Sequence, residues 1–151
     1  MLLEDIVESW KEDSKIDSSN LSDESEKTYA LHAKYMDIYS LERLTLKTLQ
    51  LDMKRLELAK HEFLLQGPSK ETQSKGWVYP VSGKVLVSDE KLYREADKQI
   101  QDLSFRIEQS QVKVDVLYSI INAINQRVYT VNSMIKREIW AKQKPGNLTR
   151  N

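Results

Sequence analysis

The clearest pattern in this sequence lies at residues 100–135, which read IQDLSFRIEQSQVKVDVLYSIINAINQRVYTVNSMI. Apolar residues recur there at alternating steps of three and four over five heptads, interrupted by Ser110. Such spacing keeps one apolar seam on the same side of a helix and is typical of a coiled coil. It predicts a long helix over residues 89–143, with acidic residues in its first turn at the positive end of the helix dipole.

Two further helices are expected before this one. Residues 3–13 are amphipathic at helical steps, and residues 21–66 contain neither Gly nor Pro. Gly67 and Pro68 then end the longer of these helices. The chain is therefore expected to be a single all-α domain over residues 1–151, in which a short helix precedes two long antiparallel helices that form a coiled-coil hairpin.

The segment between the two long helices is rich in helix breakers. Residues 67–88 are expected to form a small β-hairpin or, equally well, a loop, because short apolar runs flank a Pro and a Gly. Ser88 is expected to cap the second long helix. A Pro-Gly pair after Lys144 then ends this helix and leaves a polar tail at residues 144–151.

The helix at residues 21–66 has apolar residues on two opposite sides when they are placed at 100° per position. One side holds Tyr35, Tyr39, Leu46, Leu49, Met53, Leu56 and Phe63, whereas Leu44, Leu51, Leu58 and Leu65 repeat every seven residues nearly opposite. The other long helix can cover only one side. Because burial of a leucine is worth about 1.5 to 3 kcal/mol, a second copy of the chain is expected to cover the other side.

Self-association into a closed homo-oligomeric ring is therefore expected, since cyclic closure is the usual way to bury such surfaces. The apolar seam of the helix at residues 89–143 is the predicted oligomerisation surface. Its residues are Leu103, Ile107, Val114, Leu117, Ile121, Ile124, Val128, Val131 and Ile135. The alternative is a monomeric bundle that the N-terminal helix closes.

Composition and charge exclude several classes of protein. The chain contains no cysteine, so a disulfide framework, a thiolate zinc site and a cysteine nucleophile are excluded. A signal-like opening and any run of about 18 uncharged apolar residues are absent, so we expect a cytoplasmic protein that does not enter a membrane. Residues 1–27 carry a net charge of about −6 and the remainder about +6, which suits either a solvated acidic helix or contact of the basic part with a polyanion.

Catalytic signatures are absent. His61 opens a motif like that of a zinc protease, but Leu65 occupies the place of the second histidine, so no metal pair forms. The four glycines form no phosphate-binding loop, and no serine has a base placed to activate it. We therefore expect no enzyme activity, no catalytic residue, no metal and no cofactor.

A line of basic residues on the helix at residues 21–66 is the best candidate for a binding site. Arg43, Lys47, Lys54 and His61 fall within about 40° of one another, so phosphates of a nucleic-acid strand can follow them. The predicted nucleic-acid-binding set is completed by Arg55, Lys60 and Lys70. A solvated helix face is the more common meaning of such a line, although repetition around a ring adds the phosphate contacts together.

Two more features fit the same kind of ligand. Trp77 and Tyr79, in the breaker-rich segment, are expected to offer a stacking face to an unpaired base. A second basic cluster suits either nucleic acid or the negative end of the helix dipole. It comprises Arg127, Lys136, Arg137, Lys142 and Lys144.

Several positions fall in register with those of a known family. They are Leu3, Glu4, Asp5, Ile16, Asp17, Ser18, Leu21, Lys34 and Ser40 in the N-terminal half, and Ile124, Arg127, Tyr129, Val131, Met134 and Trp140 in the last helix. Through them the chain resembles the UvsY family, the recombination mediators of T4-type bacteriophages, over nearly its whole length. The middle segment differs in length and composition.

The resemblance implies a ring of six or seven subunits that binds single-stranded DNA in the cytoplasm of the host cell. It also implies that the protein loads a recombinase onto strands coated by a single-strand-binding protein, and that the C-terminal helix drives assembly. The family's DNA site includes a Lys-x-Arg pair, which here reads Leu58-Ala59-Lys60, so Lys54 and Arg55 are expected to compensate for the lost lysine. The alternative function is that of a structural coiled-coil assembly or adaptor protein without DNA binding.

Overall fold

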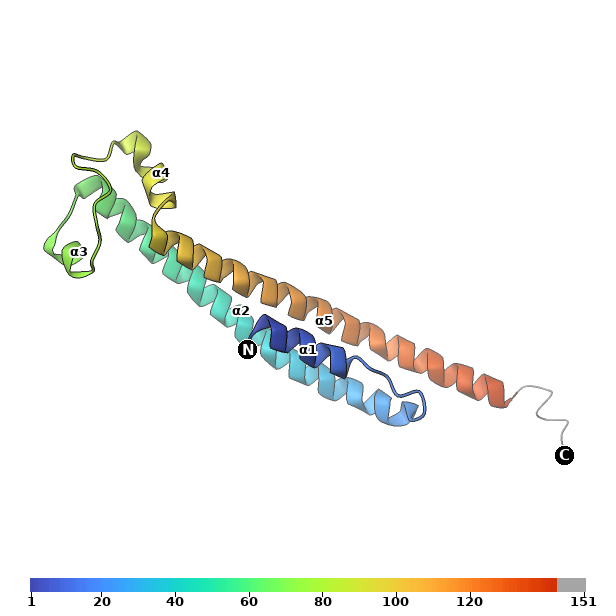
Figure 1. Ribbon diagram of the computed structural model, residues 1–151. Coiled ribbons are helices and arrows are strands. Elements are labelled where there is room, and N and C mark those ends of the chain that lie inside the picture. Colours follow the sequence, from blue (N-terminus) through green and yellow to red (C-terminus); the bar gives the residue numbers. More distant parts are fainter. Residues whose placement is uncertain (144–151) are drawn as a thin grey trace, which may run out of the picture. The chain divides into compact units, whose positions relative to one another are not determined.

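Helices joined by loops make up the part of the chain that the computed structural model describes, residues 1–143 (Figure 1). The helices are α1 (Leu3–Asp13), α2 (Leu21–Gln66), α3 (Lys70–Ser74), the 3-10 turn η1 (Val87–Asp89), α4 (Glu90–Glu95) and α5 (Lys98–Lys142). This part contains no strand, which confirms the predicted all-α class. None of its helices has the length and apolar character to cross a membrane. The polar tail expected at residues 144–151 lies outside the described residues.

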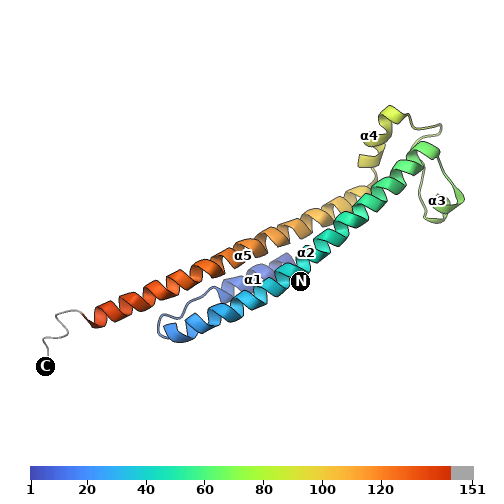
Figure 2. The same cartoon turned by 180° about the vertical axis from the view of Figure 1, so that it is seen from behind.

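Two compact units divide these helices. The first comprises Met1–Glu42 and the chain from Lys113 onward, and the second comprises Arg43–Val112. Both long helices, α2 and α5, therefore contribute one part to each unit. In the first unit, α1 lies along the adjacent parts of α2 and α5, as the views from the front and from behind agree (Figures 1 and 2).

A closed apolar core holds the first unit together, because α1 adds a third helix to the pair. The core consists of Ile6 from α1, Leu31 and Tyr35 from α2, and Leu117, Ile120, Ile121 and Ile124 from α5. Trp10 of α1 packs edge-on against Tyr35, with ring centroids 5.5 Å apart. Ile6, Tyr35 and Leu117 are fully buried, so this unit needs no second chain to cover them.

Polar contacts fix the end of α1 on α2. The Tyr35 hydroxyl donates a hydrogen bond to Asp13 Oδ2 at 2.9 Å, and Lys34 Nζ lies 2.6 Å from the same oxygen. Burial raises the pKa of Asp13, but the hydrogen bonds from Lys34 and Tyr35 outweigh burial and lower that pKa below its ordinary value. Burial, together with Asp13, raises the pKa of Tyr35. The folded first unit therefore favours ionised Asp13.

A buried arginine ties three segments of the first unit together. Arg127 of α5 is 5% exposed and forms an ion pair with Glu24 of α2. Its Nε donates to Thr28 Oγ1 at 3.1 Å, and its Nη1 donates to the carbonyl oxygen of Ser14 at 3.4 Å. Buried charges are stable when they are paired and hydrogen-bonded in this way. Arg127 is thus an internal residue, and its assignment to a basic surface cluster is wrong.

The other members of that cluster lie elsewhere. Lys136, Arg137 and Lys142 are exposed on the last turns of α5, and Lys142 Nζ lies 3.3 Å from Glu138 Oε1. This i,i+4 pair is the solvated arrangement that helices commonly carry. Lys144 lies outside the described residues.

The segment that follows α2 in the second unit contains no β-hairpin, so that alternative is wrong. Gly67 follows the last residue of α2 and has a positive φ of +86°, which ends the helix. The Ser69 side chain accepts a hydrogen bond from Thr72 N and so caps α3. The Tyr79 hydroxyl then donates to the carbonyl oxygen of Leu64 at 2.6 Å and accepts from Val85 N at 3.0 Å. The Tyr79 side chain therefore supplies hydrogen-bond partners to backbone groups of two segments. In a β-hairpin, pairing between the strands would supply such partners.

The expected continuous helix over residues 89–143 is interrupted near its start. α4 ends at Glu95, and α5 begins at Lys98 after Ala96 and Asp97. Asp97 Oδ2 accepts from Ile100 N at 3.1 Å, so Asp97 caps α5. The expected cap, Ser88, lies instead inside η1. Asp97 also contacts α2, because its Oδ1 lies 3.0 Å from Lys60 Nζ.

Candidate nucleic-acid interface

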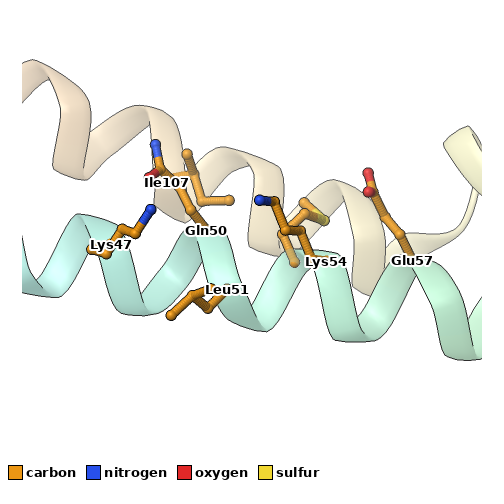
Figure 3. A pocket seen from close by; sticks show the side chains of 7 residues that line it. Lys47, Gln50, Leu51, Lys54, Glu57 and Ile107 are labelled. Atoms are coloured by element: carbon orange, nitrogen blue, oxygen red, sulfur yellow. The ribbon is translucent and has the colours of Figure 1, made fainter.

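Two lysines of the predicted basic line edge an open groove in the second unit. Lys47 and Lys54 are exposed on α2, where helical residues seven apart lie about 10 Å from each other along the axis. The groove has a volume of about 350 Å³ and is lined by Lys47, Gln50, Leu51, Met53, Lys54, Glu57 and Ile107 (Figure 3). Neither Lys47 nor Lys54 forms an ion pair within residues 1–143, so both ammonium groups are available to an anionic ligand.

Three further predicted residues also keep a charge at the surface. Arg43 and Lys70 are exposed, the latter as the first residue of α3. Arg55 is 80% exposed, and its guanidinium lies 3.7 Å from Asp52, a pair of the kind that solvent weakens. The structure therefore leaves six of the seven predicted residues at the surface of the second unit, namely these three together with Lys47, Lys54 and His61.

His61 is exposed on α2, but its ring contacts a carboxylate of the second unit. Its Nδ1 lies 2.9 Å from Glu90 Oε1, and Arg94 Nε lies 2.7 Å from the same oxygen. Burial raises the pKa of Glu90, but hydrogen bonds from Arg94 and His61 outweigh burial and lower it. The ionised Glu90 therefore joins α2 to α4 and offsets the positive charge at this end of the basic line.

Lys60 lies inside the second unit and not on the basic surface. It is 4% exposed, its ammonium lies 3.0 Å from Asp97 Oδ1, and it sits 3.8 Å from the centroid of the Trp77 ring. A contact with phosphate would require it to leave both partners. No sequence signal predicted this burial, because it depends on Asp97, which is distant in the sequence. The long stem of a lysine can lie within a core when its ammonium group pairs with a carboxylate.

The Lys-x-Arg pair that the resemblance implies therefore has no exposed cation in this chain. Its first position is Leu58, which is 59% exposed, and its second is the buried Lys60. Lys54 and Arg55, one turn earlier on α2, are exposed. Any contact between this part of α2 and phosphates falls to those two residues and to Lys47.

The aromatic residues expected to stack on a base face the protein instead. Trp77 and Tyr79 both pack edge-on against the buried Phe63, with ring centroids 5.4 and 5.5 Å from that of Phe63. Both hydroxyl contacts of Tyr79 and the Lys60 contact of Trp77 fix these rings. They form the small core of the loop and are only partly exposed, so they are not the open stacking platform that single-strand-binding proteins use.

The residues predicted to form the oligomerisation surface lie mostly within the chain's own core. Val114, Leu117, Ile121, Ile124 and Val131 are at most 8% exposed. Leu103, Ile107 and Ile135 are partly buried, and Val128 is 37% exposed. The seam of α5 therefore covers α2 of the same chain, because an antiparallel neighbour in one chain competes for the same apolar strip as a second copy.

Two apolar rows remain exposed on the outer sides of the second unit. The leucine row, Leu44, Leu51 and Leu58 on α2, is 67%, 43% and 59% exposed. On α5, Phe105 and Val112 are 64% and 38% exposed and form the second row. Phe105 precedes the partly buried Ile107 by two residues, which is about 200° around a helix, so it points away from α2. The rows thus lie on opposite sides of the helix pair.

No group of three or more His, Asp or Glu side chains within residues 1–143 is arranged to hold a metal ion. The arrangement described so far is a pair of helices with an open, lysine-edged groove and exposed apolar rows. Exposed basic residues along one helix are a common arrangement in proteins that contact nucleic-acid phosphates.

A comparison of the sequence with known protein families identifies the family of this chain. The family described as recombination, repair and ssDNA binding protein UvsY matches residues 9–144. The chain therefore belongs to the UvsY family, whose members are recombination and repair proteins that bind single-stranded DNA. A search of curated proteins finds no match.

Crystal structures of the bacteriophage T4 recombination mediator protein UvsY share the fold. The lattice type II structure has a TM-score of 0.80 and 18% identity, and the match covers 93% of this chain and 98% of that one. The lattice type IV structure has a TM-score of 0.77 and 18% identity, with 93% and 99% covered. The lattice type I structure has a TM-score of 0.78 and 17% identity, with 91% and 98% covered.

Proposed function

We propose that this protein is a recombination mediator of the host-cell cytoplasm that binds single-stranded DNA as a homo-oligomer and promotes loading of a recombinase onto strands coated by single-strand-binding protein. The observation that carries the proposal is the pair of unpaired lysines, Lys47 and Lys54, at the edge of a groove in a chain of the UvsY family. Arg43, Arg55 and Lys70 extend the positive surface. Since these contacts reach phosphates, binding depends little on base sequence and falls as salt rises.

The exposed apolar rows support assembly into a ring. Each leucine row on α2 can receive the Phe105 and Val112 row on α5 of the next copy, because the two rows lie on opposite sides of the pair. A contact between two different faces repeats from copy to copy and closes into a ring when the rotation allows. A ring of six or seven subunits, as the family resemblance implies, would place the lysines of every subunit on one DNA strand and multiply their effect.

A salt titration tests the DNA-binding part. Affinity for a fluorescent oligo-dT is measured from low to moderate salt for the unsubstituted protein and for Lys47→Ala/Lys54→Ala. The slope of log K against log salt is expected to fall by about 1.4 for each subunit engaged, because each phosphate contact on a single strand contributes about 0.7. Lys11→Ala/Lys15→Ala is the matched control, since it removes two exposed lysines from α1 and its loop. Equal slopes for all three proteins would show that Lys47 and Lys54 do not contact DNA.

A strand-coating assay tests the mediator part. Oligonucleotides are first covered with single-strand-binding protein, and recombinase filaments are then followed by fluorescence with and without this protein. We expect faster filament formation with the unsubstituted protein and a loss of the acceleration with Lys47→Ala/Lys54→Ala. Assembly without retention on single-stranded DNA at low salt would favour the structural adaptor, which the exposed leucine row supports.

A further inference from the structure

The groove between α2 and α5 has the features of a nucleotide site and not only of a phosphate-binding edge. Lys47 and Lys54 stand about 10 Å apart along α2, at the two ends of one stretch of the groove. Between them lie Gln50, whose amide can both donate and accept hydrogen bonds, and the apolar side chains of Leu51 and Met53. Glu57, one turn after Lys54, adds a carboxylate at that end of the groove. Ile107 of α5 closes the opposite wall (Figure 3).

The bases of a bound strand need an apolar surface near these lysines. Trp77 and Tyr79 do not supply one, because their rings pack on Phe63 and are fixed by Lys60, Leu64 and Val85. Phe105 points to the opposite side of α5 from Ile107. Among the described residues of the second unit, the groove is the apolar surface that the lysines themselves border.

The geometry points to a base-binding site in this groove: one base of the single strand inserts between Gln50, Met53 and Ile107 while the phosphates on either side of it contact Lys47 and Lys54. The inference rests on the proposed function, because it assumes that the bound polyanion is single-stranded DNA. Two cations that bracket an apolar floor match the alternation of phosphate and base along a strand. Gln50, Met53 and Ile107 then determine how far binding depends on the base.

An oligonucleotide without bases separates the two contributions. Affinity is measured for oligo-dT and for an abasic oligomer with the same number of phosphates, at one salt concentration. We expect the unsubstituted protein to bind the abasic oligomer about tenfold more weakly, a loss of about 1.4 kcal/mol, because the abasic strand places no base in the groove. Gln50→Ala and Ile107→Ala are expected to remove most of that difference and to leave abasic binding unchanged. Gln99→Ala, at an exposed glutamine of α5, is the matched control.

The outcomes distinguish this inference from the proposed function. Equal affinity of the unsubstituted protein for both oligomers would overturn the base site and leave DNA binding intact. Failure to bind either oligomer would overturn both. A change in solution mass with Gln50→Ala or Ile107→Ala would show that a second copy of the chain occupies the groove, and would also overturn the base site.

Photo-crosslinking gives a test that needs no variant. An oligonucleotide with 4-thiothymidine is irradiated with the unsubstituted protein, which is then cut with trypsin. Cleavage after Lys47 and Lys54 releases residues 48–54, and cleavage after Arg106 and Lys113 releases residues 107–113. We expect the base to be attached to one of these two peptides. Attachment mainly to residues 76–84, which contain Trp77 and Tyr79, would place the base on the loop and contradict the inference.

Discussion

The two units use the same pair of helices in opposite ways. In the first unit, α1 covers the pair, and side chains such as Tyr35 and Leu117 have no exposed surface. In the second unit, Leu44 and Leu58 on α2 remain more than half exposed, and the groove beside them is open. The long helices carry apolar residues on more than one side, so the third helix closes the core of the first unit, whereas part of the apolar surface of the second unit stays exposed.

Arg127 offers the largest expected effect, because it belongs to the closed unit. Arg127→Ala leaves the carboxylate of Glu24 buried without its partner and is expected to lower the free energy of unfolding by about 3 to 5 kcal/mol. Urea unfolding followed by circular dichroism measures it. Glu24→Leu/Arg127→Met should recover most of the loss, since no charge is then left buried. Lys136→Ala, at an exposed position of α5, should change the unfolding free energy by less than about 0.5 kcal/mol. A small loss for Arg127→Ala would contradict the internal role.

Leucine truncations compare the two units directly. Leu117→Ala removes a fully buried side chain and is expected to cost about 2 to 5 kcal/mol at any protein concentration. Leu58→Ala, on the exposed leucine row, is expected to cost little in dilute protein and to lower the solution mass measured by sedimentation. If Leu58→Ala left the mass unchanged, the leucine row would not be a contact between copies.

Variants of Lys60 and Lys54, both on α2, distinguish a contribution to stability from a contribution to DNA binding. Lys60→Ala removes a buried cation from Asp97 and is expected to cost about 1 to 3 kcal/mol of unfolding free energy, with no change in the salt dependence of DNA binding. Lys54→Ala is expected to do the reverse, because its ammonium is exposed. Thermal unfolding and the salt titration are compared for both variants. If Lys60→Ala reduced the slope of log K against log salt and left stability unchanged, Lys60 would be a DNA-binding residue and not an internal one.

The smallest expected effect is an acid dependence of the first unit. The pKa of Asp13 is lowered in the folded protein, so its contribution is present above its unfolded value of 3.8 and is lost as pH falls through the folded value. We expect Asp13→Asn to remove this dependence, which amounts to about 1 kcal/mol or less. Unfolding in urea between pH 6 and 3, about the range in which carboxylates titrate, measures it. Identical pH profiles for the two proteins would exclude Asp13 as the group responsible.

The sequence predicted the structure best where a single local pattern, such as apolar periodicity or a helix breaker, determines the backbone. The helical class followed from the long apolar seam, and α2 ends at Gln66, just before Gly67 and Pro68. Prediction from the sequence failed where a side chain replaced a backbone signal, because Asp97 divides the last helix without Gly or Pro. It left a loop and a β-hairpin equally open for residues 67–88, where Tyr79 organises a loop. Local composition does not show which distant backbone groups one hydroxyl or carboxylate will satisfy.

The candidate site was predictable in part for the same reason. Lys47 and Lys54 could be placed on one face by counting residues, and the structure keeps them exposed on the edge of one groove. The burial of Lys60 and Arg127 depends on Asp97 and Glu24, which are far away in the sequence. A periodic pattern identifies which side of a helix a cation occupies, but its partner is set by the packing of other segments.

The double role of Asp97 has a consequence for motion in the second unit. One carboxylate holds both the first turn of α5 and the ammonium of Lys60, which in turn lies over Trp77. Opening either contact weakens the other, so the start of α5, the end of α2 and the intervening loop should exchange their amide hydrogens for deuterium at closely similar rates. They would then behave as one small cooperative element within the unit that carries the lysine-edged groove.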